Sequence, residues 1–177
     1  MSIIPDVVTP EAYKLLPSPE KIKVRNALYD DIGIIDAYVQ DNPQNLSQDE
    51  LEIIKSWKKF RRGDYFIERF LKKYTIFIGG EKVYGVLALQ DALEDLLAYV
   101  RLPYYVRTTL LPFKGQIIYD GLLEGYAVSF GGGVKANLKE VYMAAKQNGK
   151  IIESFEPQKW AESANRKKKP GKDWTPL

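Results

Sequence analysis

Two segments rich in β-branched and aromatic residues constrain the fold of this 177-residue chain more than any other feature. The first, KYTIFIGGEKVYGVLAL, has two apolar runs on either side of Gly79 and Gly80. The second is YYVRTTLLPFKGQIIYDGLL, residues 104–123. Apolar β-branched runs that flank a short glycine-containing turn are typical of β-hairpins. A small antiparallel sheet is therefore expected.

Patterns typical of helices precede this sheet. Apolar residues recur at helical spacing over residues 20–40, with Gly33 as a weak point. Ser47 and Glu50 form a capping box, so a helix is expected to begin at Ser47. The next segment, residues 65–71, alternates only loosely and fits either a strand or a helix.

Further turn and cap signals divide the second half of the chain. Asp91, followed by Glu94, is expected to cap a short helix. Pro112 and Gly115 suit a turn, and a last helix is expected to end at residues 148–149. These patterns predict an α+β fold: a small antiparallel sheet, curled into a partial barrel, with flanking helices. The expected organisation is an arm and helix packed on the body (1–45), a core domain (46–152), and a loosely docked segment with a basic tail (153–177).

The absence of two residue types limits the available chemistry. No cysteine is present, which excludes disulfides, thiolate nucleophiles and cysteine-based zinc sites. No histidine is present either, which excludes Ser-His triads, histidine-based metal hydrolases and histidine phosphorelays. We expect no metal and no cofactor. The sequence shows no membrane-length apolar run and no secretory leader pattern, so the expected location is the cytoplasm.

The segment SFGGGVKANL has two interpretations. Backbone N–H groups at a helix start attract anions, so Gly132, Gly133, Val134 and Lys135 are candidates for binding a phosphate or carboxylate. The segment lacks the ending of a P-loop and the spacing of a dinucleotide-binding fingerprint. The simpler interpretation is that the glycines let a strand turn tightly into a helix. Alanine at Gly132 or Gly133 would then be destabilising wherever φ is positive.

Asp120 is the carboxylate most closely flanked by apolar residues, in IIYDGLL. Such a carboxylate could be desolvated and have a raised pKa, as a general acid does. An Asp-Gly pair is also a turn or bulge dipeptide, whose aspartate accepts hydrogen bonds from nearby backbone N–H groups. We expect no second carboxylate near Asp120 in the sequence to complete a glycosidase-like pair, while one brought close by the fold stays open.

Basic residues gather in two clusters, at 55–73 and 166–172, although the net charge is only +3. Such clusters bind nucleic acid or an acidic protein through phosphate or carboxylate contacts. Solvated helix faces have the same composition. The candidate contact residues are Lys55, Lys58, Lys59, Arg62, Lys167, Lys168 and Lys169.

Two other groups of residues have alternative structural explanations. Asp91, Glu94 and Asp95 resemble half of a metal site, but they also suit the first turn of a helix. A stacking platform for a ligand is conceivable where tyrosines are frequent, although aromatic residues in strands more often form core and cross-strand pairs. These tyrosines are Tyr13, Tyr104, Tyr105 and Tyr119.

Three blocks within residues 46–150 resemble a group of bacterial proteins of unknown function. They are DELEIIKSWKKFRRGDYFIERFLKKYTIFI, VYGVLALQDALEDLL and LPYYVRTTLLPFKGQIIYDGLLEGYAVSFGGG. The resemblance implies a single bacterial cytoplasmic domain and supplies no catalytic residues.

Three functions stay open at this point. The favoured hypothesis is a non-enzymatic, cytoplasmic interaction or regulatory module with an unknown partner. The first alternative is a nucleic-acid-binding protein that uses the basic residues of 55–73 and the 166–172 tail. The second alternative is a small carboxylate-dependent hydrolase centred on Asp120.

Overall fold

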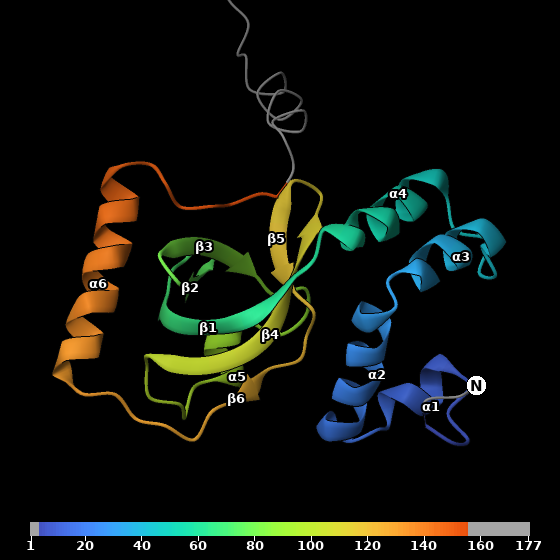
Figure 1. Cartoon of the computed structure of the whole chain (residues 1–177), viewed down its shortest axis with the longest axis horizontal. Coiled ribbons are helices and arrows are strands. Elements are labelled where there is room, and N and C mark those ends of the chain that lie inside the picture. The colour runs from blue at the N-terminus through green and yellow to red at the C-terminus, as the bar shows by residue number, and fades with distance from the viewer. Residues whose placement is uncertain (1–3, 156–177) are drawn as a thin grey trace, which may run out of the picture.

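The computed structural model describes residues 4–155. A β-barrel lies between a group of N-terminal helices and one C-terminal helix (Figure 1). The helices are α1 (Pro10–Lys14), α2 (Ser18–Asp30), α3 (Gly33–Asp41), α4 (Gln48–Ser56), the 3-10 turn η1 (Trp57–Lys59), α5 (Leu93–Leu96) and α6 (Gly132–Gln147). The strands are β1 (Arg61–Phe70), β2 (Thr75–Gly79), β3 (Lys82–Leu87), β4 (Tyr104–Phe113), β5 (Gln116–Tyr119) and β6 (Glu124–Gly125).

The first five strands close into a barrel, and β6 pairs with Val106 and Arg107 of β4. The order is β1-β2-β3-β5-β4, and β4 pairs again with β1. β3 and β5 are parallel, whereas the other neighbouring strands are antiparallel. α5 lies in the connection between β3 and β4. This strand order is that of an OB-type Greek-key barrel. The predicted α+β fold with a curled sheet and flanking helices is confirmed.

β1 belongs to both halves of the barrel. Residues 61–67 pair with β4 and residues 66–70 pair with β2, with a bulge between Ile67 and Arg69 that bends the strand. Tyr65 and Ile67 fill the interior, while Phe66 packs on the outer face. Because both faces carry apolar side chains, the alternation expected of a half-buried strand is weak here. Most of residues 65–71 belong to β1, and this weak alternation explains why their sequence fits either a strand or a helix.

Apolar side chains fill the barrel interior. Ile67, Phe77, Val106, Leu110 and Ile117 are fully buried in one cluster. Leu93 and Leu97, in and just after α5, belong to the same cluster. Burial of such side chains contributes about 1.5–3 kcal/mol each, so the barrel is the main apolar core.

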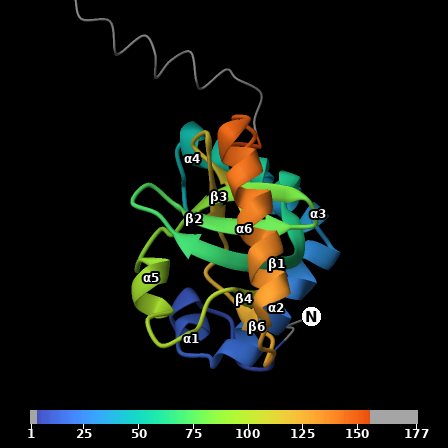
Figure 2. The same cartoon turned by 90° about the vertical axis from the view of Figure 1, so that its left-hand side faces the viewer.

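α6 covers the outer face of β2 and β3 (Figure 2). Leu138 and Tyr142 of this helix pack against Ile76, Ile78 and Val83. Strand β2 is therefore buried on both faces, which explains its uninterrupted apolar run.

The N-terminal helices cover the outer face of β4 and β5. Tyr29 of α2 packs against Leu111 and Ile118, and its ring lies 4.5 Å from that of Phe60. Trp57 is partly buried in the same cluster. Two apolar clusters outside the barrel thus hold helices on opposite sides of it.

Several predicted local signals are present. Ser47 and Glu50 form the expected capping box at the start of α4. Gly80, with φ +62, makes the turn between β2 and β3. A break falls between α2 and α3 just before Gly33, and α6 ends at residue 147, with Asn148 as its C-cap.

Three other local predictions differ from the structure in whole or in part. Asp91 does not cap α5, because the N-cap position is Ala92 and no side chain caps this four-residue helix. Gly115, with φ +74, lies in the predicted turn, but Pro112 lies within β4, past the residues that pair with β1. Gly132 and Gly133 have no positive φ and form the first turn of α6, so the predicted reason for their sensitivity to alanine is absent.

Within residues 4–155, no helix is long and apolar enough to span a membrane. No cluster of acidic side chains suited to a metal ion occurs in this part of the chain either. Asp91, Glu94 and Asp95 accordingly do not form such a cluster.

Candidate ligand-binding cleft

A cleft of about 700 Å³ lies between the N-terminal helices and the barrel. Leu89 and Leu96 are 57% and 52% exposed at its edge, so the cleft opens to solvent there. A concave, largely apolar surface with a few polar groups is the usual form of a small-molecule site. The lining residues are Tyr13, Val24, Arg25, Leu28, Tyr29, Trp57, Leu89, Gln90, Asp91, Leu96, Leu111, Ile118, Tyr119, Asp120, Gly121 and Leu122.

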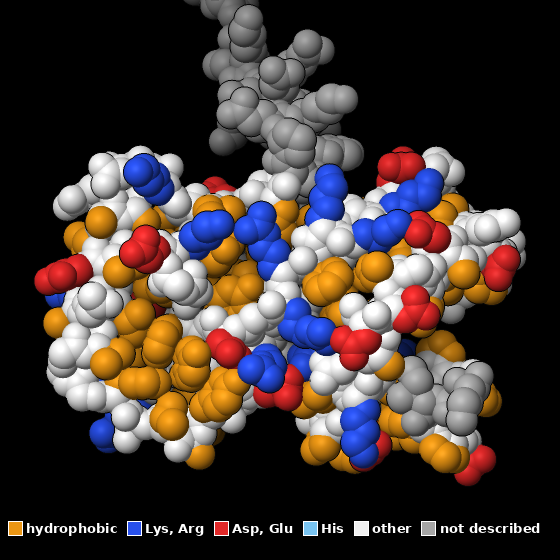
Figure 3. All heavy atoms as spheres, in the orientation of Figure 1, with side chains coloured by type: hydrophobic (Ala, Val, Ile, Leu, Met, Phe, Trp, Pro, Cys, Tyr) orange, Lys and Arg blue, Asp and Glu red, His pale blue; other side chains and the backbone are white. Residues whose placement is uncertain are grey.

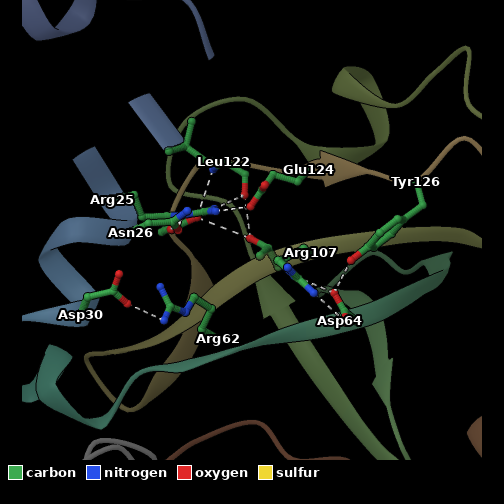
Figure 4. A network of polar contacts seen from close by, with 11 residues as sticks. Arg25, Asn26, Asp30, Arg62, Asp64, Arg107, Leu122, Glu124 and Tyr126 are labelled. Carbon is green, nitrogen blue, oxygen red and sulfur yellow. Dashed lines mark hydrogen bonds and ion pairs between the residues drawn. The ribbon is translucent and has the colours of Figure 1, made fainter. Parts of the chain in front are cut away.

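Arg25 connects α2 to the segment that follows β5 (Figure 4). Its side chain is only 4% exposed. The guanidinium donates hydrogen bonds to the Glu124 carboxylate and, at 3.4 Å, to the Leu122 carbonyl. Its Nε atom lies 3.6 Å from Oδ2 of Asp120. Removing one partner of a buried ion pair costs about 3–5 kcal/mol, so these contacts hold α2 on the barrel.

Asp120 organises the chain immediately after β5. Its Oδ1 atom accepts hydrogen bonds from the Leu122 N–H at 3.1 Å and the Thr108 hydroxyl at 3.4 Å. Gly121 has φ +87, a conformation that favours glycine. The predicted Asp-Gly turn is therefore present.

The same carboxyl group is also strongly desolvated. Its side chain is 7% exposed. Burial raises the pKa of Asp120 from 3.8 to about 6, although the positive charge of Arg25 and the hydrogen bonds to the carboxylate oppose the shift. Asp120 is thus both a turn residue and a buried titratable group.

Three buried polar atoms of the described chain have no hydrogen-bond partner: Nε1 of Trp57, Oγ1 of Thr109 and Oδ2 of Asp120. Trp57 and Asp120 line the cleft. The Thr109 hydroxyl also acts to lower the pKa of Asp120. Unsatisfied buried groups cost about 1–3 kcal/mol each and call for an explanation. For Oδ2 of Asp120, the ion pair with Arg25 is one.

Tyrosines from both walls surround the Asp120 carboxylate. Burial raises the pKa of Tyr13, Tyr29 and Tyr119, and the negative charge of Asp120 raises it further in each case. These residues come from α1, α2 and β5. The carboxylate therefore lies in an aromatic environment to which the helices and the barrel both contribute.

Another polar cluster occupies the outer face of β1 and β4 (Figure 4). Asp64 accepts hydrogen bonds from Arg107 at 3.0 Å and from the Tyr126 hydroxyl at 2.8 Å. The hydrogen bond from Arg107 is the main cause of the lowered pKa of Asp64. These contacts fasten the segment after β6 to the barrel.

Aromatic rings continue this outer face towards α6. The Phe66 and Tyr105 rings stack at 4.5 Å, Tyr105 and Tyr126 stack at 4.8 Å, and Phe130 meets Phe66 edge-on at 5.2 Å. Figure 3 shows hydrophobic side chains gathered over β1, β4 and the beginning of α6. Because the ring faces contact each other, the stack holds the 126–130 segment in place.

The four tyrosines considered as a stacking platform do not form one. Tyr13 lines the cleft, Tyr119 is buried against the interior core, and Tyr104 packs beside that core. Tyr105 belongs to the aromatic stack on the outer face.

Three of the four predicted nucleic-acid or partner contacts within residues 4–155 are engaged in ion pairs. Lys58 contacts Asp36 at 2.6 Å, Arg62 contacts Asp30 at 2.8 Å, and Lys55 lies 3.7 Å from Glu52. Figure 3 shows acidic side chains interspersed among the basic ones over this part of the molecule. Lys59 lies in η1. The other predicted contacts, Lys167, Lys168 and Lys169, lie outside the described residues.

The predicted anion-binding residues share the first turn of α6. The Lys135 N–H donates to the Gly131 carbonyl at 3.3 Å, as in an ordinary helix start. A helix N-terminus alone does not define a site, so anion binding by Gly132, Gly133, Val134 and Lys135 stays a prediction. The face of β2 and β3, through which OB-folds bind oligonucleotides and oligosaccharides, is covered by α6.

Sequence reasoning missed Arg25, Trp57 and Glu124 as members of the site. One signal was available for Arg25, since it lies four residues before Tyr29 and a charged residue on an apolar helix face needs a partner. Glu124 follows Asp120 by four positions, contrary to the expectation that no second carboxylate lay nearby. Arg25 contacts both of these carboxylates.

No protein-family model matches the chain, and no curated protein or solved structure is significantly similar to it. Any assignment of function therefore rests on the chemistry of the cleft and its surroundings.

Proposed function

We propose that this chain is a non-enzymatic, cytoplasmic binding module that holds a small organic molecule between its N-terminal helices and its barrel. One observation carries the proposal: the cleft of about 700 Å³ has an apolar and aromatic lining around the carboxylate of Asp120. A small molecule with an apolar body and a polar group would suit such a lining.

The contacts of Arg25 favour binding over hydrolysis. A glycosidase-type pair has its two carboxyl groups free on either side of the bond to be cleaved. Here one guanidinium contacts both Asp120 and Glu124. A binding role needs no such freedom, because the charged groups have only to position the ligand.

The location of the cleft suggests how binding would be regulatory. α1 and α2 line it from one side and β4 and β5 from the other, so a bound molecule contacts both parts of the chain. A ligand that binds only when the N-terminal helices are packed on the barrel stabilises that packing by mass action.

A fragment screen by ¹H–¹⁵N NMR tests the proposal. Hits are expected to shift resonances of cleft residues. In Leu28→Trp, the larger indole side chain is expected to fill the cleft and abolish these shifts. The matched control is Leu71→Trp, because Leu71 is 38% exposed and does not line the cleft. Hits that bind Leu28→Trp as well as the wild type, while that variant keeps its melting temperature, would contradict the proposal.

A further inference from the structure

We infer that the molecule bound in this cleft is an organic amine in its ammonium form, attached to an apolar body. The inference rests on the proposed binding function and assigns the chemical class of the ligand. Charge, ring chemistry and the apolar walls each favour this class.

Carboxylates outnumber cations around the cleft. The charged residues that line it are Arg25, Asp91 and Asp120. Arg25 is itself neutralised by Glu124, which lies outside the lining. Two carboxylates therefore line the cleft beside one guanidinium that Glu124 already neutralises, and an added cation would reduce the repulsion between these two carboxylates.

Arg25 is also poorly placed to attract an anionic ligand. Its guanidinium donates to Glu124 and to the Leu122 carbonyl, and its Nε donates to the Asn26 side chain at 3.3 Å. A ligand carboxylate would meet Asp91 and Asp120 without a compensating cation.

The aromatic lining adds to the preference for a cation. Tyr13 and Trp57 are partly buried in the lining of the cleft, whereas the Tyr29 and Tyr119 rings are buried in the apolar clusters beside it. The faces of such rings attract ammonium groups, most strongly where water is excluded. Around the buried carboxylate of Asp120 these rings form a site suited to an amine.

The rest of the cleft is suited to an apolar body. Leu28, Leu111 and Ile118 form part of its walls, and the half-exposed side chains of Leu89 and Leu96 extend the apolar surface to the mouth. An aryl or alkyl group bound there would remove apolar surface from water. Such a ligand would have one charged end and one hydrophobic end.

Three probes with the same phenyl ring and two-carbon linker test the charge preference: 2-phenylethylamine, 2-phenylethanol and 3-phenylpropanoate. Each is titrated at pH 7 into the full chain at millimolar concentrations, and the shifts of cleft resonances are followed by ¹H–¹⁵N NMR. The amine is expected to bind about tenfold more tightly than the alcohol. The carboxylate is expected to bind most weakly.

Matched variants locate the preference in the cleft. Asp91→Asn and Asp120→Asn should each bring the affinity of the amine close to that of the alcohol. Asp36→Asn is the control, because Asp36 lies in α3, is 60% exposed and pairs with Lys58 outside the cleft. Asp91 is exposed, so Asp91→Asn provides the test even where Asp120→Asn fails to fold.

The outcomes separate this inference from the proposed function. Equal affinity for amine and alcohol, tighter binding of the carboxylate, or an amine preference that survives both cleft variants would overturn the inference while leaving a ligand-binding cleft. If no probe shifts cleft resonances and the fragment screen also yields no hit there, both the inference and the proposed function are wrong.

Discussion

Two opposing effects act on the ionisation of the Asp120 carboxyl group. Burial disfavours the charged carboxylate, whereas the Arg25 guanidinium, the Leu122 N–H and the hydroxyls of Thr108 and Thr109 favour it. Burial is the larger effect, and the pKa is raised from 3.8 to about 6. At this position the turn interpretation and the desolvated-carboxylate interpretation both hold, because the two oxygen atoms have different surroundings.

The raised pKa of Asp120 predicts a specific pH dependence of stability. Between about pH 4 and pH 6 the folded state binds more protons at this residue than the unfolded state does, so the free energy of unfolding falls as the pH rises. The loss is about 3 kcal/mol over that window, and Asp120→Asn removes this contribution.

Urea unfolding of the wild type and Asp120→Asn from pH 4 to pH 7 measures this effect. The wild-type stability should decline relative to that of the variant as the pH rises. Groups with the opposite shift, such as Asp64 and Glu153, are common to both proteins and cancel in the difference. A flat difference would mean that Arg25 and the hydrogen bonds balance burial, and a difference that increases with pH would mean that they outweigh it.

At the scale of single elements, the position of a glycine decides what it contributes. Gly85 lies in β3, and a Cβ atom there would be 2.8 Å from the Tyr74 ring, which packs beside the cluster under α6. Gly133 lies in the first turn of α6, with no neighbouring atom within 4 Å of an added Cβ. Neither residue has a positive φ. Their different surroundings should therefore determine the effect of alanine.

We expect Gly85→Ala to destabilise the protein by about 1–3 kcal/mol, since the added methyl group overpacks the contact with Tyr74. Gly133→Ala should be neutral or stabilising by up to about 1 kcal/mol, because alanine is the better helix former. Chemical denaturation of the two variants measures both changes. A loss of more than 1 kcal/mol for Gly133→Ala would reveal a constraint on the α6 start that its geometry does not contain.

Elements governed by local chemistry could be predicted from the sequence. The capping box at Ser47 and the turn at Gly80 depend on residues within a few positions of each other. The start of α5 could not be predicted in this way. It is set by Leu93, which is buried in the barrel core, so a tertiary contact outweighs the cap expected at Asp91.

At the scale of the whole molecule, the curled barrel could be predicted but the cleft could not. Its polar centre joins Arg25 to Glu124, 99 positions away in the chain. Trp57 reaches the same cleft from η1. No pattern of spacing or composition predicts that these residues lie close together, because their contacts depend on how the N-terminal helices dock on the barrel.

This docking also predicts that the helices and the barrel unfold together. Tyr29 shares a buried cluster with Leu111 and Ile118 of the barrel, and Arg25 is buried against the segment after β5. Separating the two parts would expose this cluster and leave the Arg25 charge without its partners. The cost should link the two parts into one cooperative transition.

Two probes of the same urea titration test this cooperativity. Trp57 fluorescence reports on the helices once Trp160→Phe and Trp174→Phe make it the single tryptophan, and hydrogen exchange at the Ile76 and Phe77 amides reports on the barrel. Both should give the same free energy of unfolding, and Tyr29→Ala should lower both by about 3 kcal/mol. Tyr99→Ala is the control: this side chain is fully exposed, and its loss should change stability by less than about 0.5 kcal/mol. A Trp57 transition at lower urea, with the barrel amides still protected, would show instead that the helices undock from an intact barrel.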